Sequence, residues 1–327
     1  MRRRDFLTVL GSAAAWPLAA RAQQPALPVV AFFTGRSLDD AVRYSTTFRK
    51  GLAETGFIEG QNVSIEYHWL GGRNDDLQTL MADLVQRRVA VIVTQGANSA
   101  ALAAKAATTT IPIVFGVGED PVKMGLVASL ARPGGNMTGV NFLNQEVAAK
   151  RLGLLHDVVP KATRIAVLVN PTNPLITDST QRDISEAARA LGLHTRILKA
   201  GTSREIDTAF ASLGNEPADA LFVANDAFFA SRRVQFAILA TRYLIPVTYS
   251  NRDFVEAGGL MSYGSDISDS YRQVGMYAGR IVKGAKPADL PVIQSSKFEF
   301  VINMAAARTL GLTVPGDVLS IADEVIE

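Results

Sequence analysis

Short apolar runs rich in β-branched and aromatic residues alternate with alanine- and leucine-rich stretches from residue 28 to about residue 250. Each apolar run, such as 89–94, has the length of one buried strand, and each intervening stretch, such as 75–87, has the length of one helix. Strands that alternate with helices form βαβ units, which build a mainly parallel sheet covered by helices. The pattern therefore predicts an α/β fold.

The alternation occurs twice along the chain. In the first half it predicts strands at 28–34, 63–69, 89–94 and 111–117 and helices at 40–55, 75–87, 99–109 and 121–130. In the second half it predicts strands at 164–170, 194–198, 220–224 and 245–249 and helices at 177–191, 204–213 and 231–242. The two halves correspond element by element, so we expect two doubly wound, Rossmann-like lobes.

Glycine-rich segments suggest where the chain passes from one lobe to the other. The Pro/Gly cluster at 132–136 predicts the first crossing, 257–261 the second, and 288–296 the third, with hinge glycines near 135 and at 258–259. The amphipathic stretch 267–283 is expected to return to the first lobe. The predicted N-terminal lobe therefore comprises residues 27–138 plus 264–290, and the C-terminal lobe comprises 139–263 plus 291–327.

The composition narrows the class of protein. A chain of 327 residues with 48% hydrophobic and 20% charged residues has room for two full-size cores. The formal net charge of +2 argues against nucleic acid as a partner. The absence of cysteine excludes disulfides, thiol nucleophiles, zinc–thiolate sites and a lipid-bearing N-terminal cysteine.

Residues 1–22 have the organisation of a secretory signal peptide. Three arginines at positions 2–4 precede an apolar stretch that ends at the Ala20-Arg21-Ala22 cleavage motif. Arg3-Arg4-Asp5-Phe6-Leu7 is similar to the twin-arginine export signal. The apolar run is shorter than the ~20 residues of a membrane span, so we expect a periplasmic protein without a stable membrane anchor.

Catalytic motifs are absent from the sequence. It contains no phosphate-binding G-x-x-x-x-G-K-[ST] loop, no G-x-S-x-G nucleophile elbow and no H-E-x-x-H zinc motif. Gly116-Val117-Gly118 lacks the third glycine of a dinucleotide fingerprint. The sequence therefore favours a binding protein over an enzyme, with no cofactor and no metal.

Several blocks resemble a known family. They are Thr94-Gln95-Gly96, the segment 115–121 (FGVGEDP), the segment 131–139 (ARPGGNMTG), Asn170-Pro171 and the tail 310–315. On these blocks the chain resembles the ABC-transporter substrate-binding proteins related to the tryptophan-binding protein TrpX. The resemblance extends over essentially all residues beyond the signal peptide. The resemblance implies a type I periplasmic-binding-protein fold, in which two lobes joined by three crossings close on a small molecule. It also implies an ABC permease and its ATPase as partners, and a ligand that resembles an aromatic amino acid.

The first lobe offers candidate binding residues just beyond its strands, where open α/β sheets bind their ligands. Asn98 or Ser99 could bind a ligand carboxylate at a helix start or only cap that helix. Arg36 could pair with a carboxylate or be solvated, and Asp120 could be an N-cap. The candidates here are Arg36, Ser37, Gln95, Asn98, Ser99 and Asp120.

The second lobe offers amides, a carboxylate and aromatic rings at the corresponding positions. Asp226 could pair with a ligand ammonium group, and Phe228 or Tyr249 could stack on an apolar ligand, although Phe228 could equally be a core residue. The candidates from this lobe and the crossing segments are Asn141, Asn170, Asn173, Asp226, Phe228, Tyr249 and Ser250.

Together these residues predict a monomeric periplasmic receptor of an ABC uptake transporter. Its ligand would be a small carboxylate-bearing molecule, an aromatic or branched amino acid, held in the cleft between the lobes. Two alternatives stay open: a receptor that signals to a membrane protein without transport, and a hydrolase or transferase that uses Asp120 or Asp226 as a base.

Overall fold

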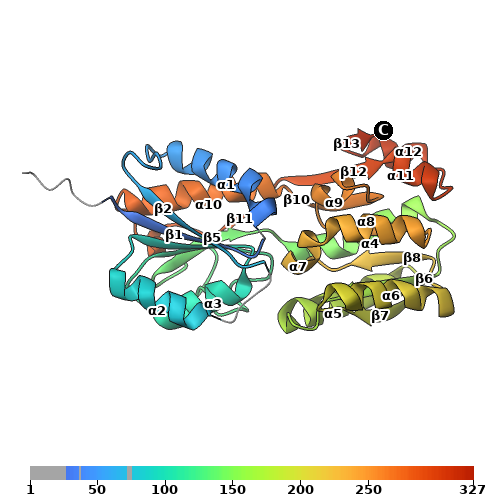
Figure 1. Cartoon of the computed structure of the whole chain (residues 1–327), viewed down its shortest axis with the longest axis horizontal. Coiled ribbons are helices and arrows are strands. Elements are labelled where there is room, and N and C mark those ends of the chain that lie inside the picture. Colours follow the sequence, from blue (N-terminus) through green and yellow to red (C-terminus); the bar gives the residue numbers. More distant parts are fainter. Residues whose placement is uncertain (1–26, 37, 72–75) are drawn as a thin grey trace, which may run out of the picture.

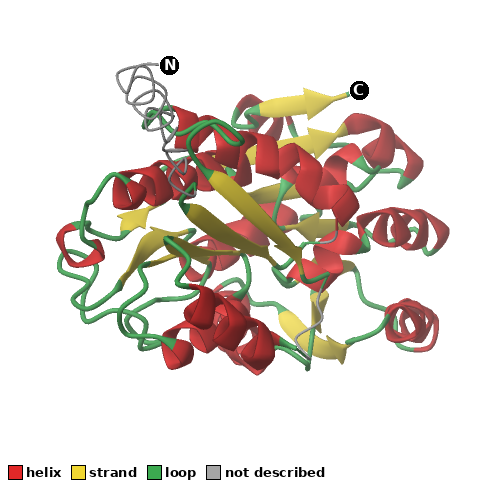
Figure 2. Ribbon diagram, turned by 60° about the vertical axis from the view of Figure 1, so that its left-hand side comes forward, coloured by secondary structure: helices red, strands yellow, loops and turns green. Residues whose placement is uncertain are grey.

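The computed structural model describes residues 27–36, 38–71 and 76–327, which form two lobes side by side (Figure 1). Each lobe has its own sheet, and helices surround the strands of both sheets (Figure 2). The predicted α/β fold with two doubly wound lobes is confirmed. The predicted signal peptide at residues 1–22 and the candidate Ser37 lie outside the described residues.

The first lobe contains a parallel six-stranded sheet with the order β11-β5-β4-β3-β1-β2. Its strands are β1 (Val29–Thr34), β2 (Ser64–Trp69), β3 (Val91–Gln95), β4 (Ile113–Val117), β5 (Met137–Asn141) and β11 (Ile293–Gln294). Every residue of β3, β4 and β5 is buried, as expected for a parallel sheet that is covered on both faces.

Helices cover both faces of this sheet. They are α1 (Leu38–Ala53) and α10 (Ile267–Val282) on one face and α2 (Leu77–Arg87) and α3 (Asn98–Ala107) on the other. Neighbouring residues of a strand point to opposite faces, so Phe32 of β1 packs in the cluster with α1 and α10, and Phe33 packs in the cluster with α2 and α3. The predicted return of the 267–283 helix to the first lobe is confirmed.

The second lobe contains a seven-stranded sheet with the order β13-β12-β10-β9-β8-β6-β7. Its strands are β6 (Arg164–Val169), β7 (His194–Lys199), β8 (Ala220–Val223), β9 (Val247–Tyr249), β10 (Met261–Ser265), β12 (Phe298–Asn303) and β13 (Glu324–Ile326). Only the β10–β12 pair in this sheet is antiparallel.

One continuous hydrophobic core joins the helices of the second lobe to its sheet. The helices of this lobe are α4 (Asn144–Val158), α5 (Pro174–Ala190), α6 (Ser203–Asn215), α7 (Ala227–Ser231), α8 (Arg233–Arg242), α9 (Arg252–Glu256), α11 (Met304–Thr309) and α12 (Gly316–Ser320). The short 3₁₀ helix η1 (Pro287–Asp289) precedes β11.

Among the described residues, no helix has the length and apolar character that are needed to cross a membrane.

The predicted helix at 121–130 is wrong, because this segment forms turns. The amides of Leu126 and Val127 both donate to the carbonyl of Pro121, and Gly125 adopts a left-handed φ of 71°. The glycine ends the first turn before a helix can continue. The eight predicted strands all occur, within a few residues of their predicted ends.

The chain crosses between the lobes after β5, after β10 and after β11. The predicted lobe boundaries at 138, 263 and 290 each lie a few residues too early, since the strands continue up to the crossings. The glycines that the sequence predicts as hinges do not lie at the crossings. Gly135 precedes β5 and Gly258 precedes β10, and both occupy turns with a left-handed φ. At the first crossing the non-glycine Leu143 has a φ of 58°, and its amide donates to Oδ1 of Asn141 at 2.9 Å.

Candidate ligand-binding cleft

Two adjoining chambers lie between the lobes, at the carboxyl ends of β3 and β8. The first chamber has a volume of about 90 Å³ and the second of about 240 Å³. Both are lined by residues of each lobe, which is the expected place for a ligand in an open α/β sheet. The residues that line both chambers are Gly96, Asn98, Asn173, Asp226 and Ala227.

Asp226 supplies a buried carboxylate to both chambers. It is the N-cap of α7, and its Oδ1 accepts from the amides of Phe228 at 3.0 Å and Phe229 at 3.3 Å. Nδ2 of Asn170 also donates to Oδ1 at 3.0 Å, whereas Oδ2 has one longer contact, with Nδ2 of Asn173 at 3.3 Å. Oδ2 therefore retains capacity for a further donor.

The environment of Asp226 also sets its acidity. Burial raises the pKa of this carboxyl above its ordinary value, and the hydrogen bonds from the two asparagines and the two amides oppose that rise. No cation forms an ion pair with Asp226 in the part of the chain that the structure describes. A cationic ligand group at Oδ2 would supply the missing positive charge.

Asn98 faces Asp226 across the chambers from the first lobe. It is the first residue of α3 and does not cap it: the N-cap is Ala97, and no side chain caps this helix. The Nδ2 atom of Asn98 is buried and has no hydrogen-bond partner among the described residues. The alternative that Asn98 only caps the helix is therefore wrong, and its amide is available to a ligand. Ser99, the next residue, lines the second chamber.

Gln95 ends β3 and lines the first chamber. Its Nε2 donates to Oγ of Ser270 at 3.1 Å, and its buried Oε1 has no partner among the described residues. The adjacent Gly96 has a left-handed φ of 63°, which turns the chain sharply from β3 into α3.

Apolar side chains complete both chambers, and most of them were not predicted from the sequence. Phe228 does line the second chamber, and its half-buried ring also packs on the core of the second lobe. Tyr271 of α10 lines the first chamber, a position that the strand-end rule cannot find because it lies in a helix. The other apolar residues of the lining are Leu70, Ala97, Leu102, Phe142, Pro174, Leu175, Ile176, Ala227, Ala230 and Ile267.

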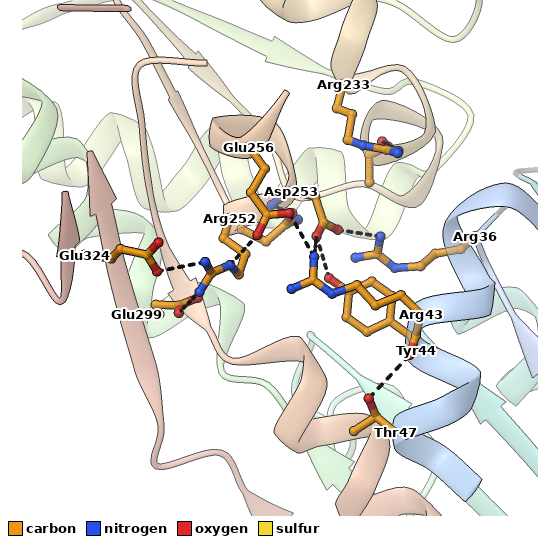
Figure 3. A network of polar contacts seen from close by, with 12 residues as sticks. Arg36, Arg43, Tyr44, Thr47, Arg233, Arg252, Asp253, Glu256, Glu299 and Glu324 are labelled. Carbon is orange, nitrogen blue, oxygen red and sulfur yellow. Dashed lines mark hydrogen bonds and ion pairs between the residues drawn. The ribbon is translucent and has the colours of Figure 1, made fainter. Parts of the chain in front are cut away.

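Arg36 lines the first chamber, and its guanidinium pairs with the opposite lobe. Its Nη1 lies 2.8 Å from Oδ2 of Asp253, with both side chains buried (Figure 3). Tyr44 donates to Oδ1 of the same carboxylate at 2.6 Å, and Arg43 pairs with Glu256 at 2.8 Å. We call these five residues the interlobe latch. The alternative that Arg36 is solvated is therefore wrong, since its side chain is buried and its Nη1 pairs with a protein carboxylate.

Asp253 is ionised within the latch. Burial alone would raise its pKa, but the charge of Arg36 and the hydrogen bonds from Tyr44 and Arg36 outweigh burial and hold the pKa below its ordinary value. The latch thus joins charges of opposite sign across the lobes, and the structure shows the lobes in contact.

Four candidates lie apart from the two chambers. Tyr249 is fully buried in the core of the second lobe, where its ring stacks on Phe254 with centroids 4.4 Å apart. The prediction that it stacks on the ligand is therefore corrected: the last residue of β9 faces the core. Asp120 caps the turn that begins at Pro121, since the amide of Val122 donates to its Oδ1 at 2.8 Å.

The other two candidates of this kind serve as structural contacts. Asn141 holds the first crossing through the Leu143 amide. Ser250 donates to Oδ1 of Asn225 at 3.1 Å and lines a third, smaller chamber. Asn170 and Asn173 do line the second chamber, and both orient Asp226.

Known proteins share this architecture. The chain is 28% identical over 278 residues to a tyrosine-binding protein of Clostridioides difficile. The alignment covers 84% of this chain and 78% of that protein. It is 27% identical to an ABC domain from Streptococcus pneumonia solved in complex with L-Trp, with a TM-score of 0.81 over 92% of this chain and all of that one.

A ligand-free, open structure of a substrate-binding protein from Clostridium difficile gives a TM-score of only 0.65, at 25% identity over 92% of this chain and 99% of that one. The chain thus superposes better on the tryptophan complex than on the open protein. Residues 27–326 match the family described as ABC transporter substrate binding protein. The chain therefore belongs to the ABC transporter substrate-binding protein family, and its lobes have the type I periplasmic-binding-protein fold.

Proposed function

We propose that the protein binds an amino acid with an aromatic side chain between its lobes and delivers it to an ABC permease. The observation that carries this proposal is the pair of groups on opposite walls of the chambers: the Asp226 carboxylate and the unpartnered Asn98 amide. A zwitterionic ligand presents one charge to each wall. The relatives that bind tyrosine and tryptophan support the aromatic class.

The ligand ammonium group belongs at Oδ2 of Asp226. This oxygen has one long contact in the protein, and the buried carboxylate has no cationic partner among the described residues. The ligand carboxylate belongs at Asn98, where the side-chain amide and the first amides of α3 lie together with the positive end of the helix dipole.

The second chamber fits the ligand side chain. Its volume of about 240 Å³ and its apolar residues Leu102, Leu175 and Phe228 suit an aromatic or a branched side chain. The chamber is smaller than the roughly 300–1,000 Å³ typical of sites for drug-sized ligands. An aromatic ring against Phe228 gains ring contact beyond the burial of its surface, which favours aromatic over branched amino acids.

The proposed protein works by closing and not by catalysis. A ligand that contacts both lobes binds the closed state more tightly than the open state. This difference in affinity is what stabilises the closed state. The closed protein, exported to the periplasm, would then be recognised by a permease whose ATPase lies in the cytoplasm. No reaction is assigned to Asp226, because its four protein donors hold it as a binding group.

Calorimetric titration of the mature protein tests the ligand. The protein is unfolded and refolded first to remove any amino acid carried through purification, and is then titrated with tyrosine, tryptophan, phenylalanine, leucine and lysine. We expect binding of the aromatic amino acids, weaker binding of leucine and none of lysine. Equal affinity for all five, or no binding at all, would contradict the proposed ligand class.

Two variants test the proposed contacts. Asp226→Asn should weaken binding by at least about tenfold, since it removes the charge partner of the ammonium group. Asp178→Asn on the exposed face of α5 is the matched control and should bind as the unmodified protein does. Uptake of radiolabelled tyrosine by cells with and without the protein then separates transport from signalling: unchanged uptake would contradict the transport role.

A further inference from the structure

Arg151 of α4 is a buried arginine outside the two chambers. Only 3% of the surface of Arg151 is exposed to solvent. Its guanidinium lies over the ring of Phe222, with the central carbon 3.9 Å from the ring centroid, and Nη2 donates to the carbonyl of Val223 at 2.8 Å. These contacts hold the group in place, but they supply no negative charge.

No carboxylate forms an ion pair with Arg151 in the described ranges of the chain, and its buried Nε has no hydrogen-bond partner there. Burial lowers the pKa of the guanidinium to about 9, so the group is still charged at neutral pH. A buried charge without a partner is costly, unlike a buried ion pair. Among the described residues, the guanidinium therefore has no counter-charge at ion-pair distance.

The third chamber lies beside this guanidinium. Its volume of about 20 Å³ exceeds the roughly 10–15 Å³ that one water molecule needs, so it has room for one particle of about that size. Besides Arg151 its lining includes side chains with hydroxyl or amide groups, namely Ser179, Thr180, Asn225 and Ser250. It also includes the apolar side chains of Val147, Ala148, Ile176 and Phe222.

Two carboxyl groups also line the third chamber, and their charge must be considered. Asp183 has its own cation, with Nε of Arg182 3.4 Å from its Oδ1, and burial raises its pKa. Glu119 reaches the chamber from the first lobe and is buried. Among the described residues no ion pair joins Arg151 to Asp183, and burial alone sets the pKa of the guanidinium.

We propose that the third chamber binds one compact anionic group, with Arg151 as its positive partner. The group is a free monatomic anion such as a halide, or an acidic group on the molecule held in the cleft, because the third chamber shares Ile176 and Asn225 with the first. The site does not depend on an aromatic ligand in the cleft, so it can be tested without one.

Bromide is the probe for a free anion. Thermal unfolding of the refolded, ligand-free protein is measured against increasing potassium bromide at constant ionic strength, with potassium gluconate as the balancing salt because gluconate exceeds the chamber. A site in the folded state gives a saturable rise in Tm. Crystals soaked in bromide should then show an anomalous peak in the third chamber.

Three variants assign the effect to the guanidinium. Arg151→Met removes the charge and should abolish the bromide-dependent rise, and Arg151→Lys keeps the charge and should retain part of it. Arg189→Met, on an exposed arginine in the last turn of α5, is the matched control and should respond as the unmodified protein does. If Arg151→Met does not fold, the lysine variant and the diffraction peak decide.

The second source is tested with glutamate and glutamine. If bromide has no effect but glutamate binds at least about tenfold more tightly than glutamine, and Arg151→Lys reduces that preference, the anionic group belongs to the cleft ligand. The proposal is overturned if neither bromide nor glutamate depends on Arg151 and the chamber holds an ordered water only. A failure of tyrosine binding would contradict the proposed function and leave this site untouched.

Discussion

Nη1 of Arg36 in the first lobe lies 2.8 Å from Oδ2 of Asp253 in the second, and both side chains are about one-tenth exposed or less. Asp253→Asn leaves the Arg36 charge buried without a partner while the lobes are closed. Opening hydrates that charge, so the substitution favours the open state. We expect the dissociation constant for the ligand to rise roughly 10- to 100-fold, measured by calorimetry.

The ion pair between Arg49 and Glu59 provides a control for the latch, because both residues belong to the first lobe and are exposed. Arg49→Gln should leave affinity unchanged. Small-angle scattering of the ligand-free Asp253→Asn variant should show a larger radius of gyration than the unmodified protein. Equal radii and equal affinity would show that the latch does not contribute to closure.

Ligand binding should weaken in mildly acidic solution because of Asp226. Burial raises the pKa of its carboxyl, and only the ionised form attracts an ammonium group. As the pH falls through that raised pKa, affinity should decrease by up to about tenfold per pH unit. Asp253 does not titrate in this range, since its pKa is held below the ordinary value.

The Asp226 carboxyl also determines how the stability of the folded, ligand-free protein changes with pH. A raised pKa means that the folded, ligand-free protein binds the proton more tightly than the unfolded chain does, so this contribution to stability is lost as the pH rises through the raised pKa. The ligand-induced increase in Tm should therefore grow with pH from about 4 to 7. In Asp226→Asn the pH dependence should disappear; an unchanged profile would assign it to another group.

Glycines allow α1 and α10 to pack with their backbones in contact. A Cβ atom at Gly275 would lie 2.2 Å from the carbonyl oxygen of Phe48, and one at Gly51 would lie 1.9 Å from the carbonyl oxygen of Arg272. Gly275→Ala must push the helices apart, and we expect the free energy of unfolding to fall by roughly 1–3 kcal/mol, measured by urea titration.

Gly153 in α4 is the matched helix position, because a Cβ atom there would meet nothing within 4 Å. Gly153→Ala should raise the free energy of unfolding by up to about 1 kcal/mol, since alanine has the higher helix propensity. A loss of stability in both variants would show that close backbone contact is not the cause.

Tyr249→Phe separates the core role of this ring from a role in binding. The Tyr249 hydroxyl is buried and has no hydrogen-bond partner among the described residues, so its removal should leave stability unchanged or raise it by about 1 kcal/mol. Tyrosine affinity should not change. Phe228→Ala should weaken aromatic ligands, and weaker binding by the Tyr249 variant instead would place that ring at the ligand.

Sequence alone predicts the strands and the positions just after them, because both depend on local patterns. Asp226 and Asn98 follow their strands directly, and both line the chambers. Which face a side chain takes depends on register and neighbours, so Tyr249 was assigned to the cleft although it faces the core. The partner of Arg36 is Asp253, which is distant in sequence and could not be inferred from local pattern.

The predicted helix at 121–130 fails for a different reason. Its composition allows a helix, but the left-handed Gly125 ends the first turn, and a single glycine in a helical pattern does not reveal its φ. Tyr271 was missed because it reaches the first chamber from α10, whereas the strand-end rule considers loops only.

The position of α10 governs how this protein can be synthesised. The helix covers one face of the first sheet, yet it follows almost the whole second lobe in sequence. A growing chain cannot bury Phe32 or Phe48 completely until residue 282 has left the ribosome. Neither lobe is a contiguous piece of the gene, so no single truncation yields a complete lobe. A protease cut at the first or second crossing leaves α10 and strands β1–β5 on different fragments.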